Sequence, residues 1–302
     1  MDKETKTGLW VVLLILLTPI VIGLGVFMFE LSSGGGKIFT EIVLAPLLII
    51  EEIDNPKSGN AGNADYYETI NNESTYDVST YPEPTIEFIH HTTERGNLDV
   101  LRAAEVGSFI YFGEYEQDND EATGKEAIEW LVLDKQDDKM LVISRYGLDR
   151  QPFHTEYEEI TWEACSLRGW LNSSFYETAF IPEEKSLILT SEVSADAKPL
   201  HGTDGGNNTM DQVFLLSIDE ADRFFEDDVA RTCVGTPYCN ALWTNEGGIH
   251  VTCCWWLRSP GLYSYDAALV KRDGYVLDLG DLVGNIFAVR PALWIDTSSI
   301  LD

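Results

Sequence analysis

The chain of 302 residues has few basic side chains. It holds 20 Lys and Arg against 51 Asp and Glu, which gives a formal net charge of −31 at pH 7. A surface of this kind repels phosphate backbones, and no basic stripe offsets the repulsion. We therefore expect no nucleic-acid partner. Anionic lipid head groups would be repelled too, which favours a domain held away from a membrane surface.

Motifs for catalysis and metal binding are missing. The sequence has no Gly-x-Ser-x-Gly, no phosphate-binding Gly-Lys-Ser/Thr loop and no His-Glu-x-x-His. Its five cysteines include no Cys-x-x-Cys, so a structural zinc site and a dense disulfide scaffold are not expected. We assign no catalytic residue, no metal site and no cofactor. An oxidising compartment would allow a disulfide between Cys233 and Cys239.

One long run lacks charge altogether. Residues 8–29 (GLWVVLLILLTPIVIGLGVFMF) are long enough to cross about 30 Å of hydrocarbon as a helix, so we expect a lipid bilayer as a partner of this segment. Lys3 and Lys6 precede the run, and only Lys37 follows closely. The positive-inside rule then predicts a cytoplasmic amino terminus and an extracytoplasmic carboxyl-terminal domain.

The remaining composition predicts the domain organisation. A cytoplasmic tail (1–7) and a transmembrane helix (8–29) precede a juxtamembrane segment and polar stalk (30–105), a folded domain (106–296) and a short tail (297–302). The apolar run 38–50 is too short for a confident second crossing, and its role stays open. The stalk is rich in Asn, Glu, Ser, Thr and Gly and has no apolar period.

Short strands and helices without regular alternation predict an α+β fold. The strands are expected at 108–112, 128–133, 140–144 and 213–216. Helices are expected from Thr161, around 175–180, from Pro182, and from Ser217, where Ser217 and Glu220 form a capping box.

The carboxyl-terminal region predicts a hairpin between two aromatic blocks. Asp273-Gly274 joins two short alternating runs, which is a strong hairpin signal. The first block is Trp255-Trp256-Leu257-Arg258-Ser259-Pro260-Gly261, and the second is Val289-Arg290-Pro291-Ala292-Leu293-Trp294. Arg258 and Arg290 each lie in an apolar run, so we expect both to be structural clamps with buried partners.

These blocks, with Val106–Gly113, Ile128–Leu133 and Leu167–Asn172, resemble an uncharacterised family of bacterial domains common in Firmicutes. The resemblance covers Val106 to Ile295. That family is similar in its ending to the C-type-lectin-like fold of formylglycine-generating enzymes and of retroelement variable proteins. The likeness implies a frame of Trp255, Trp256, Arg258, Arg290 and Trp294. It also implies ligand-binding positions on a hairpin face: Tyr263, Ser264, Tyr265, Asp266, Lys271, Arg272, Tyr275, Asp278, Asp281 and Asn285.

The sequence therefore predicts a single-pass membrane protein that recognises a protein or glycan ligand through this hairpin face. Tyr, Ser, Asp and Asn on exposed loops are residue types that recognition surfaces favour. Two alternatives stay open. One is an oxidase of the formylglycine-generating kind that uses Cys253 or Cys254 on exported substrates, although the sequence favours a protein that is not an enzyme. The other is a structural envelope protein without a ligand.

Overall fold

The structure, a computed structural model, describes residues 24–26, 44–46, 95–195, 202–242 and 252–298. The chain divides into two compact units, Met1–Tyr76 and Asp77–Asp302. In the first unit, β1 (Leu24–Val26) pairs with β2 (Leu44–Pro46) in antiparallel fashion, so Leu24–Val26 of the predicted transmembrane helix 8–29 form a strand instead. The rest of the predicted span 8–29, the tail 1–7, the rest of the juxtamembrane segment and stalk up to residue 94, and residues 299–302 lie outside the described residues. Within the described part of the chain, no helix is long and apolar enough to cross a membrane.

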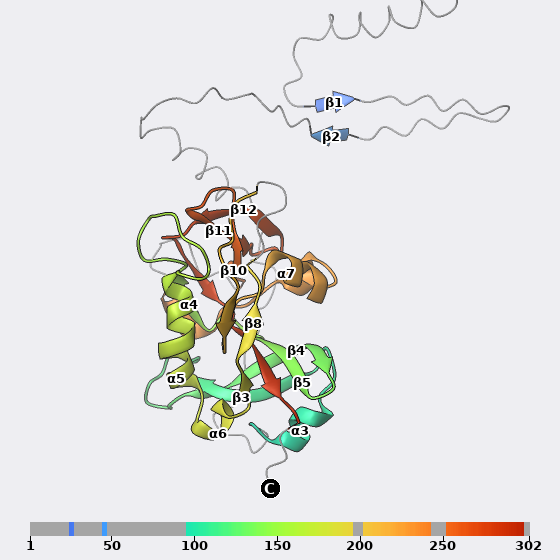
Figure 1. Ribbon diagram of the computed structural model, residues 1–302, viewed down its shortest axis with the longest axis vertical. Coiled ribbons are helices and arrows are strands. Elements are labelled where there is room, and N and C mark those ends of the chain that lie inside the picture. The colour runs from blue at the N-terminus through green and yellow to red at the C-terminus, as the bar shows by residue number, and fades with distance from the viewer. Residues whose placement is uncertain (1–23, 27–43, 47–94, 196–201, 243–251, 299–302) are drawn as a thin grey trace, which may run out of the picture. The chain divides into compact units, whose positions relative to one another are not determined.

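The second unit is α+β and consists mostly of sheet, as the sequence predicts. Its first sheet has five strands in the order β3-β4-β5-β14-β7. Register shifts between β3 and β4 and between β4 and β5 bend these strands, because a bulge increases local twist. The sheet is accordingly curled (Figure 1). Its strands are β3 (Phe109–Tyr115), β4 (Glu126–Gln136), β5 (Lys139–Ser144), β7 (Ile188–Leu189) and β14 (Ala292–Asp296).

The second sheet carries the predicted hairpin. Its five strands have the order β12-β11-β10-β13-β6, and all neighbours are antiparallel except β10 and β13. Every residue of β10 and β11 is buried, so these strands are covered on both faces and display nothing. The strands are β6 (Asp149–Pro152), β10 (Trp255–Pro260), β11 (Asp266–Val270), β12 (Val276–Leu282) and β13 (Ile286–Val289).

Short helices and one small sheet complete the domain. Figure 1 shows α3 and α6 near β3, and α7 near β10. A continuous helical stretch runs through α4, a π-helical segment and α5. The helices are α3 (Leu98–Ala103), α4 (Ser166–Trp170), η2 (Leu171–Phe175), α5 (Tyr176–Ala179), α6 (Pro182–Lys185), α7 (Ile218–Phe224), α8 (Asp228–Arg231) and α9 (Pro237–Ala241), and β8 (Ser191–Val193) pairs with β9 (Thr209–Asp211).

The strand predicted at 213–216 is wrong in type, although the segment is buried. Phe214 forms an isolated bridge with Ala292 at 2.8 and 2.9 Å, and the Leu216 carbonyl accepts one hydrogen bond from the Arg258 N–H at 2.9 Å. The Asn172 side chain binds the backbone here instead: its Oδ1 accepts from the N–H groups of Gln212 and Val213. A buried apolar run can thus stay irregular when a side chain satisfies its backbone groups.

The predicted helix starts hold in most places. The capping box of Ser217 and Glu220 is present at α7, and α6 begins at Pro182. The helix predicted from Thr161 begins later, at Ser166, because residues 161–165 form a turn that ends at the N-cap residue Cys165. The folded unit also includes α3, within the segment predicted as stalk. Leu101 of α3 is fully buried.

Candidate ligand-binding site

The predicted binding positions lie at two separate ends of the β11–β12 hairpin. Because β11 has five residues, its ends are about 13 Å apart at roughly 3.3 Å per residue. One end, here the tyrosine end, includes Tyr263, Ser264, Tyr265, Asp266, Asp281 and Asn285. The other, here the turn end, includes Lys271, Arg272 and Tyr275, and Asp278 lies half-buried in β12 between them. They do not form one continuous face.

Three tyrosines cluster at the tyrosine end. The rings of Tyr263 and Tyr265 are stacked, with centroids 5.2 Å apart and planes at 21°. Tyr157 packs on Tyr265 from a different loop, at 5.3 Å. Tyr157 and Tyr263 are 60% and 48% exposed. An aromatic cluster that stays in water offers apolar faces and hydroxyl groups together, which is a combination typical of recognition sites.

Backbone contacts hold the two tyrosine loops together. The N–H of Ile160 donates to the carbonyl of Ser264 at 2.9 Å, and that of His154 donates to Val283 at 2.9 Å. The loop 154–160 is therefore hydrogen-bonded both to the loop that carries Tyr263 and Tyr265 and to the turn after β12. Tyr157 was missed at the sequence level. The sequence did offer one signal for an exposed tyrosine. Tyr157 lies in the acidic run Glu156-Tyr157-Glu158-Glu159, and a run of charged residues stays on the surface.

Two glycines determine the path of the loop that carries Tyr263. A Cβ at Gly261 would lie 2.5 Å from the Leu279 carbonyl oxygen, and one at Gly280 would lie 2.6 Å from that of Ala267. Gly280 also has a φ of +80°. The N–H of Leu262 donates to Leu279 at 2.6 Å. The loop can follow β12 this closely only because both positions lack a side chain.

Asp266 and Asp281 are buried, unlike the other eight predicted positions, which are exposed or half-buried. Asp281 accepts hydrogen bonds from the Asn285 side chain at 2.8 Å and from the Leu282 N–H at 2.7 Å. Burial raises the pKa of Asp281, and these two bonds oppose the rise. Asp281 therefore supports the turn at Asn285 from within the domain.

Acidic side chains surround the tyrosine end. Burial raises the pKa of Tyr157 and of Tyr265, and the Asp266 carboxylate adds to both shifts. The phenols therefore stay protonated and can donate hydrogen bonds. The exposed acids Glu156 and Glu158 line the same loop as Tyr157. A neutral or cationic ligand suits this surface better than an anionic one.

The turn end is docked against the body of the domain. The Asp-Gly turn forms as predicted, with the Lys271 N–H bonded to Tyr275 at 2.8 Å and the Gly274 N–H bonded to Lys271 at 2.9 Å. Gly274 has a φ of +85°, and a Cβ there would overlap the carbonyl of Asp228 in α8. The buried Arg231 donates from Nε to the Gly274 carbonyl at 3.0 Å. Tyr275 is exposed but stands on a packed turn.

The predicted frame residues lie in the core. Trp255 and Trp256 are fully buried, and Trp294 is half-buried. Arg258 pairs with Glu220 and donates to the Leu215 carbonyl at 2.8 Å. Arg290 donates to the Ser144 carbonyl at 2.8 Å, and its guanidinium lies 5.1 Å from the Trp255 ring centroid. Arg258 ties α7 to β10, and Arg290 ties β5 to the aromatic core.

All five cysteines are free thiols. The disulfide between Cys233 and Cys239 that the sequence would allow is therefore not formed in this structure. The hydrogen bond with Cys233 and then burial raise the pKa of Cys253, and burial raises that of Cys254. A thiol with a raised pKa is a poor nucleophile at neutral pH. This chemistry gives no support to catalysis by Cys253 or Cys254.

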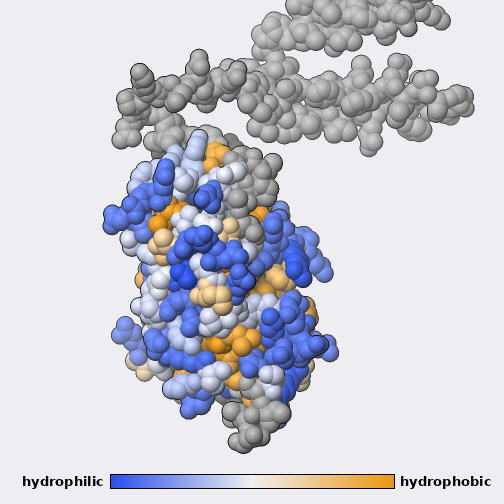
Figure 2. All heavy atoms as spheres, in the orientation of Figure 1, coloured by the Kyte–Doolittle hydropathy of each residue, from blue (hydrophilic) through white to orange (hydrophobic). Residues whose placement is uncertain are grey.

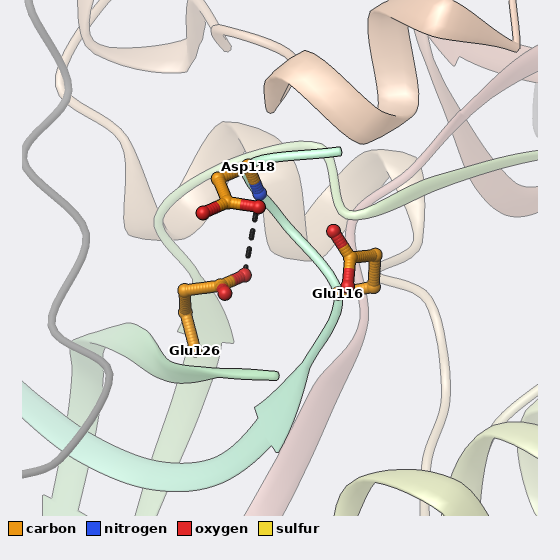
Figure 3. Close-up of side chains that lie close together, drawn as sticks. All are labelled: Glu116, Asp118 and Glu126. Atoms are coloured by element: carbon orange, nitrogen blue, oxygen red, sulfur yellow. Dashed lines mark hydrogen bonds between the residues drawn. The ribbon is translucent and has the colours of Figure 1, made fainter. Parts of the chain in front are cut away.

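Three carboxylates come together where the loop after β3 meets the start of β4. Oxygens of Glu116, Asp118 and Glu126 lie within 4.8 Å of one another (Figure 3). Backbone N–H groups hold Glu126, which accepts from Gln117 at 2.6 Å and from Asp118 at 3.2 Å. The group could offer three oxygens to a hard cation. Calcium takes six to eight oxygens, so further ligands would be required.

The structure thus defines an α+β domain with an exposed tyrosine cluster at one end of a hairpin. The chain belongs to the family described as Domain of unknown function (DUF6273), whose model matches residues 137–297, just over half of the chain. This confirms the expected membership of an uncharacterised domain family. The matched region includes both ends of the hairpin but not the carboxylates of Figure 3. No curated protein and no solved structure matches the chain.

Proposed function

We propose that this protein recognises a ligand outside the cytoplasm, and that the tyrosine end of the hairpin is its binding surface. The observation that carries the proposal is the exposed contact of Tyr157, Tyr263 and Tyr265, drawn from two loops that the backbone ties together. Aromatic rings held in water lose little conformational entropy on binding and offer large contact areas. The ligand is a glycan or another protein.

The acidic surroundings narrow the chemistry of the ligand. Anionic polymers, including nucleic acids, are disfavoured by the net charge of −31. A neutral sugar ring can stack on a tyrosine face and accept or donate hydrogen bonds at its hydroxyls. Figure 2 shows a mostly hydrophilic face with separate apolar patches, which suits a soluble recognition domain.

The same proposal places the domain on a membrane anchor. In this arrangement the apolar segment 8–29 anchors the chain in the membrane, with the amino terminus in the cytoplasm and the domain outside the cell. The length and apolar character of that segment and the order of Lys3, Lys6 and Lys37 support this arrangement. The domain adopts a C-type-lectin-like fold. The position of the last strand, β14, between β5 and β7 supports this, because the end of the domain returns to the sheet that its first strands form.

Binding of the full chain to immobilised probes tests the function. The chain, in detergent micelles, is measured against a panel of neutral oligosaccharides and a panel of extracytoplasmic bacterial proteins. A variant with Tyr157, Tyr263 and Tyr265 all changed to Ala should lose binding by at least about tenfold, because stacked aromatic contacts contribute roughly 0.5–1.5 kcal/mol each beyond their area. Tyr275→Ala, at the turn end, is the matched control. Equal binding by the triple variant and the wild type would refute the site.

A further inference from the structure

Two buried cysteines, Cys233 and Cys253, lie opposite each other at the two ends of one segment of the chain. Val234 and Thr252 form an antiparallel bridge, so Cys233 and Cys253 are the next facing pair. The N–H of Cys253 donates to the Cys233 carbonyl at 2.8 Å, and the two thiols are in hydrogen-bond contact. Directly opposed residues have Cα atoms about 5.5 Å apart, which is within the range that a disulfide spans.

A third thiol nearby, that of Cys239, has a different hydrogen-bond partner. Cys239, at the start of α9, donates from Sγ to the Asp149 carbonyl at 3.4 Å. Burial raises the pKa of the Cys239 thiol to about 12, which keeps it protonated. A Cβ at Gly147 would lie 3.1 Å from the sulfur of Cys253 and 3.6 Å from that of Cys239. The missing side chain at Gly147 therefore makes the space that these sulfurs occupy.

A buried cation lies beside the Cys233–Cys253 pair. Burial lowers the pKa of Arg290, and the charges of Cys233 and Cys253 oppose that effect. In the described part of the chain, Nη1 of Arg290 is buried and has no hydrogen-bond partner. Burial alone would raise the pKa of Cys233, but the hydrogen bond from Cys253 and the charge of Arg290 lower it below its usual range. A thiolate is the species that attacks a disulfide.

We propose that Cys233 and Cys253 form a dithiol pair that closes to a disulfide when the domain meets an oxidising low-molecular-weight disulfide. The Cys233 thiolate attacks one sulfur of the oxidant and releases one thiolate. The Cys253 sulfur, after losing its proton, then displaces the second. Two protein thiols and one external disulfide become one protein disulfide and two external thiols. Arg290 stabilises the attacking thiolate.

The bridge would fasten two segments that support the ligand-binding end. It closes the loop from Val234 to Thr252 and holds the residues after α8 against the start of β10. The other end of β10 leads into the loop with Tyr263. The proposal does not depend on what the tyrosines bind, and its test measures no ligand.

The test uses the full chain in detergent micelles, with oxidised glutathione as the probe. The reduced protein is treated with the probe both folded and during refolding, so that burial does not block access. Remaining thiols are blocked with N-ethylmaleimide in denaturant, and peptides are mapped by mass spectrometry. We expect one Cys233–Cys253 peptide pair and a Tm higher by roughly 5–10 °C, reversed by dithiothreitol, because the closed loop restricts the unfolded chain.

Variants separate this pair from the other thiols. Cys233→Ser and Cys253→Ser should each abolish the peptide pair and the reversible rise in Tm. Cys239→Ala and Cys254→Ser should keep both. The reduced Tm of each variant shows whether it folds. Full modification of all five thiols after both treatments would overturn the proposal, and so would a Cys233–Cys239 bridge or a stable glutathione adduct as the main product.

Discussion

The two ends of one hairpin differ in what their side chains do. At the turn end, Gly274 lies against α8 and its carbonyl is bound by Arg231. At the tyrosine end, two loops bring three aromatic rings together and leave them in water. The sequence predicts the turn end clearly, because Asp-Gly is a strong local motif, but no motif indicates that Tyr157 joins the tyrosine end. The comparison teaches that the clearest local motif here serves the scaffold, whereas the candidate binding surface depends on contacts between distant segments.

The largest effect is expected at the turn end, from Gly274→Ala. The new methyl group would overlap the Asp228 carbonyl, and the φ of +85° disfavours an L side chain. Together these should lower the free energy of unfolding by about 2–5 kcal/mol. Chemical denaturation measures the change. Gly284→Ala is the matched control, because nothing lies within 4 Å of its Cβ position. Similar stability of both variants would show that the turn is not docked.

Arg231→Met should weaken the same end by a smaller amount. The change removes the hydrogen bond to the Gly274 carbonyl and two ion pairs, one with Asp222 at 3.2 Å and one with Asp228. We expect a loss of about 1.5–3 kcal/mol, which is typical of hydrogen bonds to charged groups. Arg223→Met, at an exposed position of α7, should change stability by less than about 0.5 kcal/mol. A loss no larger than that of the control would contradict the docking role of Arg231.

At the tyrosine end, Asp281 should make stability depend on pH. Its pKa is raised in the folded state by burial, so the folded protein holds this proton more tightly than the unfolded chain. The contribution of Asp281 to stability is therefore complete below the ordinary aspartate pKa of 3.8 and is lost as the pH rises through the raised value. Relative to Asp281→Asn, the wild type should lose stability over this window. Parallel profiles of the two proteins in urea titrations would contradict the shift.

Much of the frame could be predicted from the sequence because it depends on local patterns. The Asp273-Gly274 hairpin, the Ser217 capping box and the burial of Trp255 and Trp256 follow from turn chemistry, spacing and apolar character. The two strands at 128–133 and 140–144 were also found, within longer limits. These elements need no information about distant residues.

The site was only partly predictable because its contacts are long-range. Tyr263 and Tyr265 were identified, but their partner Tyr157 lies in another loop that meets them only in the fold. The sequence placed Asp266 and Asp281 on the display face, whereas the structure buries both. Strand alternation could not reveal this, since β11 is covered on both faces. Likewise, spacing suggested Cys239 as the partner of Cys233, but the fold brings Cys253 opposite it.

Single tyrosine substitutions compare the two ends most directly. Tyr263→Ala and Tyr275→Ala remove the same side chain from positions that are 48% and 51% exposed, so each should change stability by less than about 1 kcal/mol. The measurement is the affinity of the full chain for whichever immobilised oligosaccharide or protein probe the wild type binds. The account predicts that Tyr263→Ala weakens binding by about three- to tenfold and that Tyr275→Ala leaves it within about twofold. Loss of binding in Tyr275→Ala with normal binding in Tyr263→Ala would contradict it.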